Sequence, residues 1–285
     1  MSTTSTTAQS IFIESGTYSE QVYIPARKAI LSIYGYTTDT SSYTENTVTI
    51  THSSSLLSGA ADDDHTATLR NWAAGTKIYN SNVKNTYGKG SQALAVSAYA
   101  DEQGYYGVQM WGYQDTLLAQ TGKQVYAKCY IQGAVDFIFG QHATAWIDST
   151  DLRVSGVGAI TANGRASSTD SSYYVIHKSS VAAASGYSIT AGTIYLGRPW
   201  SEYARVVFQK TVLSDIINSA GWEVWSTTTS NTEDVTFKEY GNTGDGASGT
   251  RASFAGKLSA AIPITEILGS SYKSWVDTSY LASSS

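Results

Sequence analysis

Two short segments of the same design carry the aspartates best placed to do chemistry. Gly112–Leu117 and Gly133–Gly140 each open with a glycine, place one aspartate in the middle and continue with apolar residues. Asp115 and Asp136 lie 21 residues apart. A recurrence of roughly 20–50 residues in a chain of short strands indicates a solenoid, in which equivalent positions of successive coils stack. We therefore expect the two carboxylates on neighbouring strands, about 4.8 Å apart along the stack.

This pair predicts an acid together with either a nucleophile or a base. Two carboxylates that close in a partly apolar setting cannot both ionise freely, so one tends to hold a proton while the other stays charged. Gln92 precedes Gln114 by 22 residues and should stack one coil away from it. The amides of Gln92 and Gln114 would then flank the carboxylates as N–H donors, which is what an oxyanion requires.

The rest of the chain has to build the coils that position these residues. Charged residues are only 14% of the 285, whereas the chain has 25 Gly, 21 Tyr and 7 Trp but 3 Pro. Such a composition favours pleated sheet over helix. We predict one all-β domain over residues 1–285, a single-stranded parallel β-helix. Residues 259–268 and the Trp275 region should form short helical or irregular elements over its C-terminal end.

Several partners and sites are disfavoured. A net charge of −5 does not favour binding to nucleic acid or to an anionic membrane. No apolar stretch approaches the roughly 18 residues of a membrane helix, and the N-terminus lacks the pattern of a signal peptide. We expect no metal site: Asp62–His65 is interpreted as a solvated loop, because consecutive carboxylates alternate direction on an extended chain. The single cysteine, Cys129, is predicted to be a buried core thiol.

Four segments, in order along nearly the whole chain, resemble the pectin methylesterase family: Gly16–Glu20, Gly112–Leu117, Gly133–Gly140 and Leu196–Trp200. The acidic balance is similar to that of the fungal members. The resemblance implies a right-handed parallel β-helix that is secreted and hydrolyses the C6 methyl esters of homogalacturonan without metal or cofactor. We expect it to act as a monomer.

The resemblance also assigns roles to the four residues singled out above. Asp136 matches the nucleophile that attacks the ester carbonyl. Asp115 matches the acid that protonates departing methanol and then, as a base, activates water. Gln92 and Gln114 match the amides that hold the oxyanion.

Two further residues follow from the resemblance alone. Arg198 matches a guanidinium that keeps the nucleophile ionised and oriented, and Trp200 matches an aromatic that lies against the sugar ring. Pro199 between them would fix the local backbone. An ordinary surface pairing of Arg198 with Glu202 is the alternative.

The first strand is the point of departure from the family. It begins near Ile11, whereas family members usually carry an earlier strand and helix that cover this end of the solenoid. We therefore expect a truncated N-terminal cap, with lower stability or association at an exposed end. Secretion rests on the resemblance alone.

Three other functions compete with ester hydrolysis. A β-helix polysaccharide lyase or glycoside hydrolase could also use two close carboxylates, although paired glutamines suit a carbonyl oxyanion better. A serine esterase is disfavoured, because no Gly-x-Ser-x-Gly occurs. A non-catalytic pectin-binding solenoid would not need Asp115, Asp136 and Arg198 together.

Overall fold

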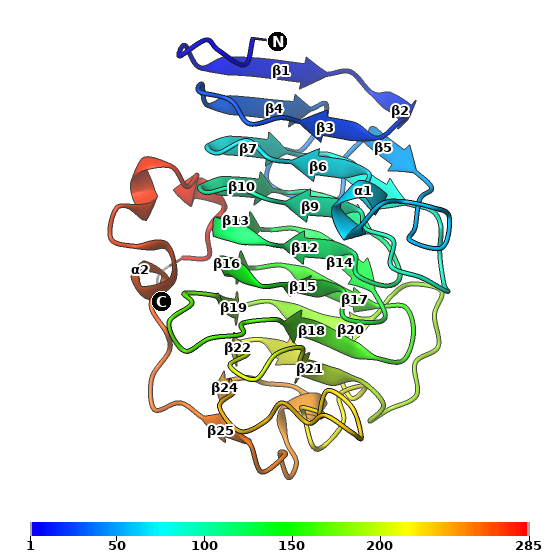
Figure 1. The fold of residues 1–285 in the computed structure, drawn as a ribbon, viewed down its shortest axis with the longest axis vertical. Helices are drawn as coiled ribbons and strands as arrows, with labels where there is room; N and C mark the ends of the chain where they lie inside the picture. Colours follow the sequence, from blue (N-terminus) through cyan, green and yellow to red (C-terminus); the bar gives the residue numbers. More distant parts are fainter. Residues whose placement is uncertain (1, 284–285) are drawn as a thin grey trace.

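Three parallel sheets wind around one elongated core in the computed structural model, which describes residues 2–283 (Figure 1). Each coil passes through the three sheets in turn, so that every strand pairs with the equivalent strand of the next coil. For example, β10 pairs with β13, β11 with β14 and β12 with β15. The arrangement is the predicted right-handed parallel β-helix.

The strands are grouped by sheet as follows. The first sheet contains β1 (Gln9–Ile13), β4 (Leu31–Gly35), β7 (Thr76–Tyr79), β10 (Gln103–Tyr106), β13 (Thr121–Ala127), β16 (His142–Asp148), β19 (Tyr173–His177), β22 (Arg205–Gln209), β24 (Thr236–Tyr240) and β25 (Ala255–Lys257). The second sheet contains β2 (Gly16–Ser19), β5 (Val48–His52), β8 (Asn82–Asn85), β11 (Gln109–Trp111), β14 (Tyr130–Gly133), β17 (Asp151–Val154), β20 (Ser180–Ala183) and β23 (Val212–Leu213). The third sheet contains β3 (Val22–Ile24), β6 (Leu69–Asn71), β9 (Val96–Ala98), β12 (Leu117–Ala119), β15 (Ile138–Gly140), β18 (Ala159–Asn163) and β21 (Tyr195–Pro199).

Helices are few and short. They are α1 (Asp63–Thr66), α2 (Ile264–Leu268) and the 3-10 helices η1 (Asp245–Ala247), η2 (Tyr272–Ser274) and η3 (Thr278–Tyr280). Across residues 2–283, no helix is both long enough and apolar enough to cross a membrane.

The core consists of ladders of like residues, one from each coil. Tyr105 of β10 lies in register with Tyr126 of β13, and Tyr126 with Ile147 of β16. The two tyrosine rings stack with centroids 4.9 Å apart, close to the spacing between coils. Cys129 is fully buried among these residues, as predicted, and its thiol donates to the carbonyl of Tyr105. Burial raises the pKa of this thiol to about 12, so the group is structural.

The chain turns between the first and second sheets at a residue with left-handed backbone. This conformation costs a non-glycine residue about 1–2 kcal/mol, and the sheet hydrogen bonds on both sides hold it in place. The equivalent corners are occupied by Asn80, Gly107, Lys128, Ser149, Lys178, Lys210 and Gly241. Because this corner has the same backbone conformation in successive coils, residues in the middle of the chain recur at nearly constant steps.

The C-terminal segment forms the short helical elements that were predicted, but their predicted place over the end of the solenoid was wrong. The segment turns back along the outer face of the first sheet, where α2 contacts β13 and β16 (Figure 1). Trp275 and Tyr280 pack there against Tyr106, Val125 and Trp146. The cause is the apolar outer face of these middle strands, which would otherwise be exposed to water.

The core at the N-terminal end is less closely filled. A cavity of about 420 Å³ lies within the first coils, lined mainly by apolar side chains such as Ile11, Ile13 and Leu31. Nearby, Phe12 of β1 is 58% exposed. The expected effect of this end on stability or association stays a prediction.

Candidate active site

All six residues predicted for the site line one cavity of about 260 Å³. The cavity lies beside the third sheet and is bounded by α1, by bends that precede β12 and β15, and by β21. Its lining residues are Asp63, Gln92, Gln114, Asp115, Asp136, Phe139, Ala162, Arg198, Trp200 and Trp225. The fold thus brings together six residues that lie more than 100 positions apart in the chain, from Gln92 to Trp200.

The two aspartates occupy equivalent places in successive coils. The prediction that they lie within strands was wrong. Each lies in a bend just before its strand, with left-handed backbone: φ is 63° at Asp115 and 48° at Asp136. The register is the predicted one, because Leu117 pairs with Ile138 and the Asp115 N–H donates to the Val135 carbonyl. A bend at this position turns the carboxylate out of the sheet ladder and into the cavity.

The glycine that opens each segment is required by this bend. A Cβ on Gly112 would lie 2.6 Å from the Thr116 hydroxyl, and one on Gly133 would lie 2.2 Å from the Cβ of Phe137. Such separations are shorter than any van der Waals contact, so only glycine fits. The glycine in the repeated Gly-x-x-Asp pattern thus permits the bend that turns the aspartate side chain into the cavity.

Arg198 forms a bidentate ion pair with Asp136. Its Nε donates to Oδ1 at 2.9 Å and its Nη2 to Oδ2 at 2.7 Å. Its Nη1 also donates to the Trp225 carbonyl at 3.3 Å, and its guanidinium lies 4.4 Å from the centre of the Trp225 ring. The alternative pairing of Arg198 with Glu202 is not the one found. Parallel N–H···O bonds of this type fix the orientation of a carboxylate as well as its charge.

The surroundings separate the two carboxyl groups in protonation. Burial raises the pKa of Asp115 well above its usual range, and the charge of Asp136 raises it further. Burial also raises the pKa of Asp136, but the hydrogen bonds and charge of Arg198 act in the opposite direction. Asp136 is therefore the group of the pair that ionises first, and Asp115 is the group that keeps its proton.

The two glutamines leave their amide donors uncommitted. The Ser91 hydroxyl donates to Oε1 of Gln92 at 3.3 Å. Within residues 2–283, neither Gln92 nor Gln114 donates a hydrogen bond from its side-chain amide to another protein group, although both line the cavity. Preorganised donors without a protein acceptor are suited to an oxygen that acquires charge during a reaction.

Comparison with known proteins gives one consistent result. The sequence profile of the family described as Pectinesterase matches residues 1–262. The chain belongs to the pectinesterase family. It is 61% identical to a pectinesterase of Aspergillus niger over 285 residues, which cover 99% of this chain and 86% of that protein. It is 45% identical to pectinesterase A of Emericella nidulans over 273 residues, covering 95% and 81%.

Solved structures agree with the pectinesterase assignment. A deglycosylated pectin methylesterase from Aspergillus niger superposes with a TM-score of 0.92 at 44% identity, covering 97% of this chain and 90% of that one. The pectin methylesterase from carrot gives 0.84 at 28% identity, covering 98% and 89%. This pectinesterase is a carboxylic ester hydrolase, and pectin is its substrate.

The floor of the pectinesterase cavity is apolar, and one of its aromatic walls was not predicted. Leu118, Phe139 and Ala162 form a small cluster against which Trp200 and Trp225 pack. The Trp200 and Phe139 rings lie 6.1 Å apart. Trp225 was missed, although it ends a recognisable apolar stretch, because the step between coils lengthens towards the C-terminus and gives no register.

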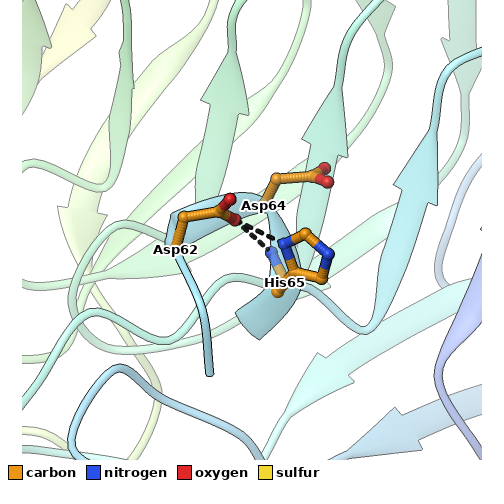
Figure 2. A group of neighbouring side chains, drawn as sticks. All are labelled: Asp62, Asp64 and His65. Atoms are coloured by element: carbon orange, nitrogen blue, oxygen red, sulfur yellow. Dashed lines mark hydrogen bonds and ion pairs between the residues drawn. The ribbon is translucent and has the colours of Figure 1, made fainter. Parts of the chain in front are cut away.

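The acidic stretch at 62–65 is not the solvated loop that was predicted. It forms α1, which Asp62 caps by accepting from the His65 N–H and its ring Nδ1, whereas no bond joins Asp64 to either residue (Figure 2). Asp64 is buried and bonded instead to Arg70, Trp72 and Ser97. Its oxygens are fully used, so although Asp62, Asp64 and His65 lie close together, the cluster serves to anchor α1.

Proposed function

We propose that this chain hydrolyses the C6 methyl esters of homogalacturonan through a covalent intermediate on Asp136. The observation that carries the proposal is the contrast between the two aspartates. They have the same backbone setting, but one is held by Arg198 and the other is buried beside a negative charge. A nucleophilic carboxylate has to be ionised and a general acid has to be protonated, and the pair offers both.

In the first half-reaction, the Asp136 carboxylate attacks the ester carbonyl carbon and the carbonyl oxygen becomes an oxyanion. The amides of Gln92 and Gln114 donate to this oxyanion. The C–O bond to the methoxy group then breaks, and Asp115 gives its proton to the departing oxygen. The products of this step are methanol and a mixed anhydride between Asp136 and the sugar carboxyl group.

In the second half-reaction, the ionised Asp115 takes a proton from water as the water oxygen attacks the sugar carbonyl. The anhydride bond breaks, which releases a galacturonate carboxylic acid and restores Asp136 as a carboxylate. Asp115 has then regained the proton that it lost, so both groups return to their starting states. Trp200 and Phe139 supply an apolar wall against which the sugar ring can pack.

Extracellular action by a monomer belongs to the same proposal. Homogalacturonan is a cell-wall polymer that cannot enter a cell, so an enzyme that removes its esters has to be exported. Gel filtration of the purified chain tests the oligomeric state, because it separates a monomer from an associated form.

The deciding experiment compares the parent chain with Asp136→Ala on highly methylated pectin, with methanol and product chain length followed together. We expect the variant to lose about 10⁴-fold or more in kcat. Asp170→Ala is the matched control, because Asp170 is also an ion-paired aspartate but contacts His142 outside the cavity. Shortened chains without methanol would instead indicate a lyase or glycoside hydrolase.

Trapping the intermediate tests the nucleophilic role directly. Rapid denaturation during turnover should leave the galacturonyl group attached to Asp136, where peptide mass spectrometry can locate it. If methanol is released but no acylated Asp136 is found in samples quenched during turnover, water attacks the ester directly and Asp136 acts as a base.

A further inference from the structure

A third carboxylate, Asp63, lines the same cavity as the two aspartates of the proposed mechanism. It is the first residue of α1, and it meets the cavity together with Gln92, Gln114 and Asp115. The position is held firmly, because the Thr66 hydroxyl accepts from the Leu94 N–H and donates to the Asp63 carbonyl. The helix thereby ties Asp63 to the coil that carries Gln92.

The side chain of Asp63 is not used to build α1. Asp62 caps the helix and Asp64 forms the ion pair with Arg70 that anchors it. By contrast, Oδ1 of Asp63 is buried and has no hydrogen-bond partner among the residues that the structure describes. An unpaired buried carboxyl oxygen is unfavourable for folding, so its retention at the wall of a reactive cavity requires a reason.

We propose that Asp63 is a positioning residue of the esterase reaction, whose negative charge at the cavity wall holds the proton on Asp115 until methanol departs. The inference rests on the proposed role of Asp115 as general acid. No bond is required between the two groups, because like charges interact through a low-dielectric cavity over several ångströms.

The charges around Asp115 are consistent with this role. After burial, the two groups that raise the pKa of Asp115 are Asp136 and then Asp63, whereas Arg198 lowers it. When Asp136 attacks the ester, its charge passes to the carbonyl oxygen, where the amides of Gln92 and Gln114 hold it, so Asp136 itself is no longer a carboxylate. At that moment Asp63 is the remaining carboxylate that disfavours premature loss of the proton.

The protonation of Asp63 itself decides which limb of the pH–activity profile Asp63 influences. Burial, and then the charge of Asp62, raise the pKa of Asp63. Asp63 therefore keeps its proton to a higher pH than an ordinary aspartate does, and its negative charge increases as the pH rises. Its influence should appear on the basic limb of the profile, where Asp115 loses its proton, and not on the acid limb, where Asp136 gains one.

The test is the pH dependence of kcat/KM for methanol release by Asp63→Asn. We expect the basic limb to move to lower pH, with a loss of about threefold or more on that limb, while the acid limb stays in place. Asp63→Glu should keep the basic limb of the parent. Asp245→Asn is the matched control, because Asp245 is also the first residue of a short helix, η1, and does not line the cavity.

Two results would overturn the inference. One is a basic limb that Asp63→Asn leaves unmoved; the other is a uniform loss at every pH, which would mean that Asp63 only supports the structure. Melting curves of each variant separate folding from function. If Asp115→Asn still shows the basic limb of the parent, the assignment of Asp115 as acid fails instead, and this outcome is distinct from the other two.

Discussion

Replacing Arg198 by lysine keeps the positive charge but removes the fork that holds Asp136. Arg198 makes two hydrogen bonds to the carboxylate, at 2.9 and 2.7 Å, and lysine can make one of them. A hydrogen bond to a charged group contributes about 1.5–3 kcal/mol. Because the Arg198 side chain is 25% exposed, against 9% for Asp136, water replaces part of the lost contact. We therefore expect about 1–2 kcal/mol, or roughly a 5- to 30-fold loss in kcat/KM.

The pH profile should change in a defined direction. Arg198 lowers the pKa of Asp136 against the effect of burial, so a weaker contact lets that pKa rise. The acid limb of kcat/KM should then move to higher pH in Arg198→Lys, and further in Arg198→Met, where the charge is lost as well. Initial rates of methanol release over a pH series measure both the loss and the shift.

The chain provides a matched control for this experiment. Arg251 holds Glu239 in the same two-pronged way, with contacts of 2.7 and 3.0 Å, far along the solenoid. Arg251→Lys should lower the melting temperature without moving either limb of the profile. If Arg198→Lys keeps kcat/KM within twofold of the parent, or if its acid limb moves to lower pH, then the contact with Asp136 does not serve the reaction.

Two more predictions concern stability. Asp115→Asn should abolish activity yet melt at a higher temperature than the parent at neutral pH: the folded-state pKa of Asp115 is raised, so this carboxyl favours the fold at acid pH and opposes it once pH rises through that pKa. Scanning calorimetry at pH 7 and near pH 4 measures this, and a variant that gains nothing at pH 7 would contradict it. Trp275→Ala should destabilise the chain by about 3–5 kcal/mol, because Trp275 is only 5% exposed where it covers the first sheet. Its kcat/KM at 25 °C should match that of the parent, and a loss of activity in the folded variant would mean that the segment also shapes the cavity.

Coil periodicity was sufficient to predict the middle of the site. From Gln92 to Asp136 the coils have short corners, so a step of 21 or 22 residues places side chains one above another. Further along, the register changes abruptly: Ala162 pairs with Arg198, 36 positions later, because the chain between them makes an excursion before it returns to the sheet. No constant step reaches Arg198, and only the family resemblance identified it.

The residues that were missed lie where neither periodicity nor a motif applies. Asp63 belongs to a helix inserted between two strands, and its sequence, three aspartates in a row, has the composition of a solvated turn. Contacts with residues outside the helix, such as those of Asp64 with Arg70 and Ser97, fold it against the sheet. Such long-range pairs are decided by tertiary structure, and local sequence does not encode them.

The two aspartates differ because the side chain of Arg198 extends far enough to bond Asp136 but not Asp115. The solenoid gives Asp115 and Asp136 equivalent bends, so backbone alone would make them alike. Arg198 breaks this equivalence from β21, where it pairs with Ala162 of the preceding coil and lies two coils beyond Phe139. Because alanine is small, the guanidinium can extend back across that coil to Asp136, but Asp115 is a further step of about 4.8 Å away. A single arginine at that position in the stack is therefore enough to make two repeated aspartates differ in how readily they ionise.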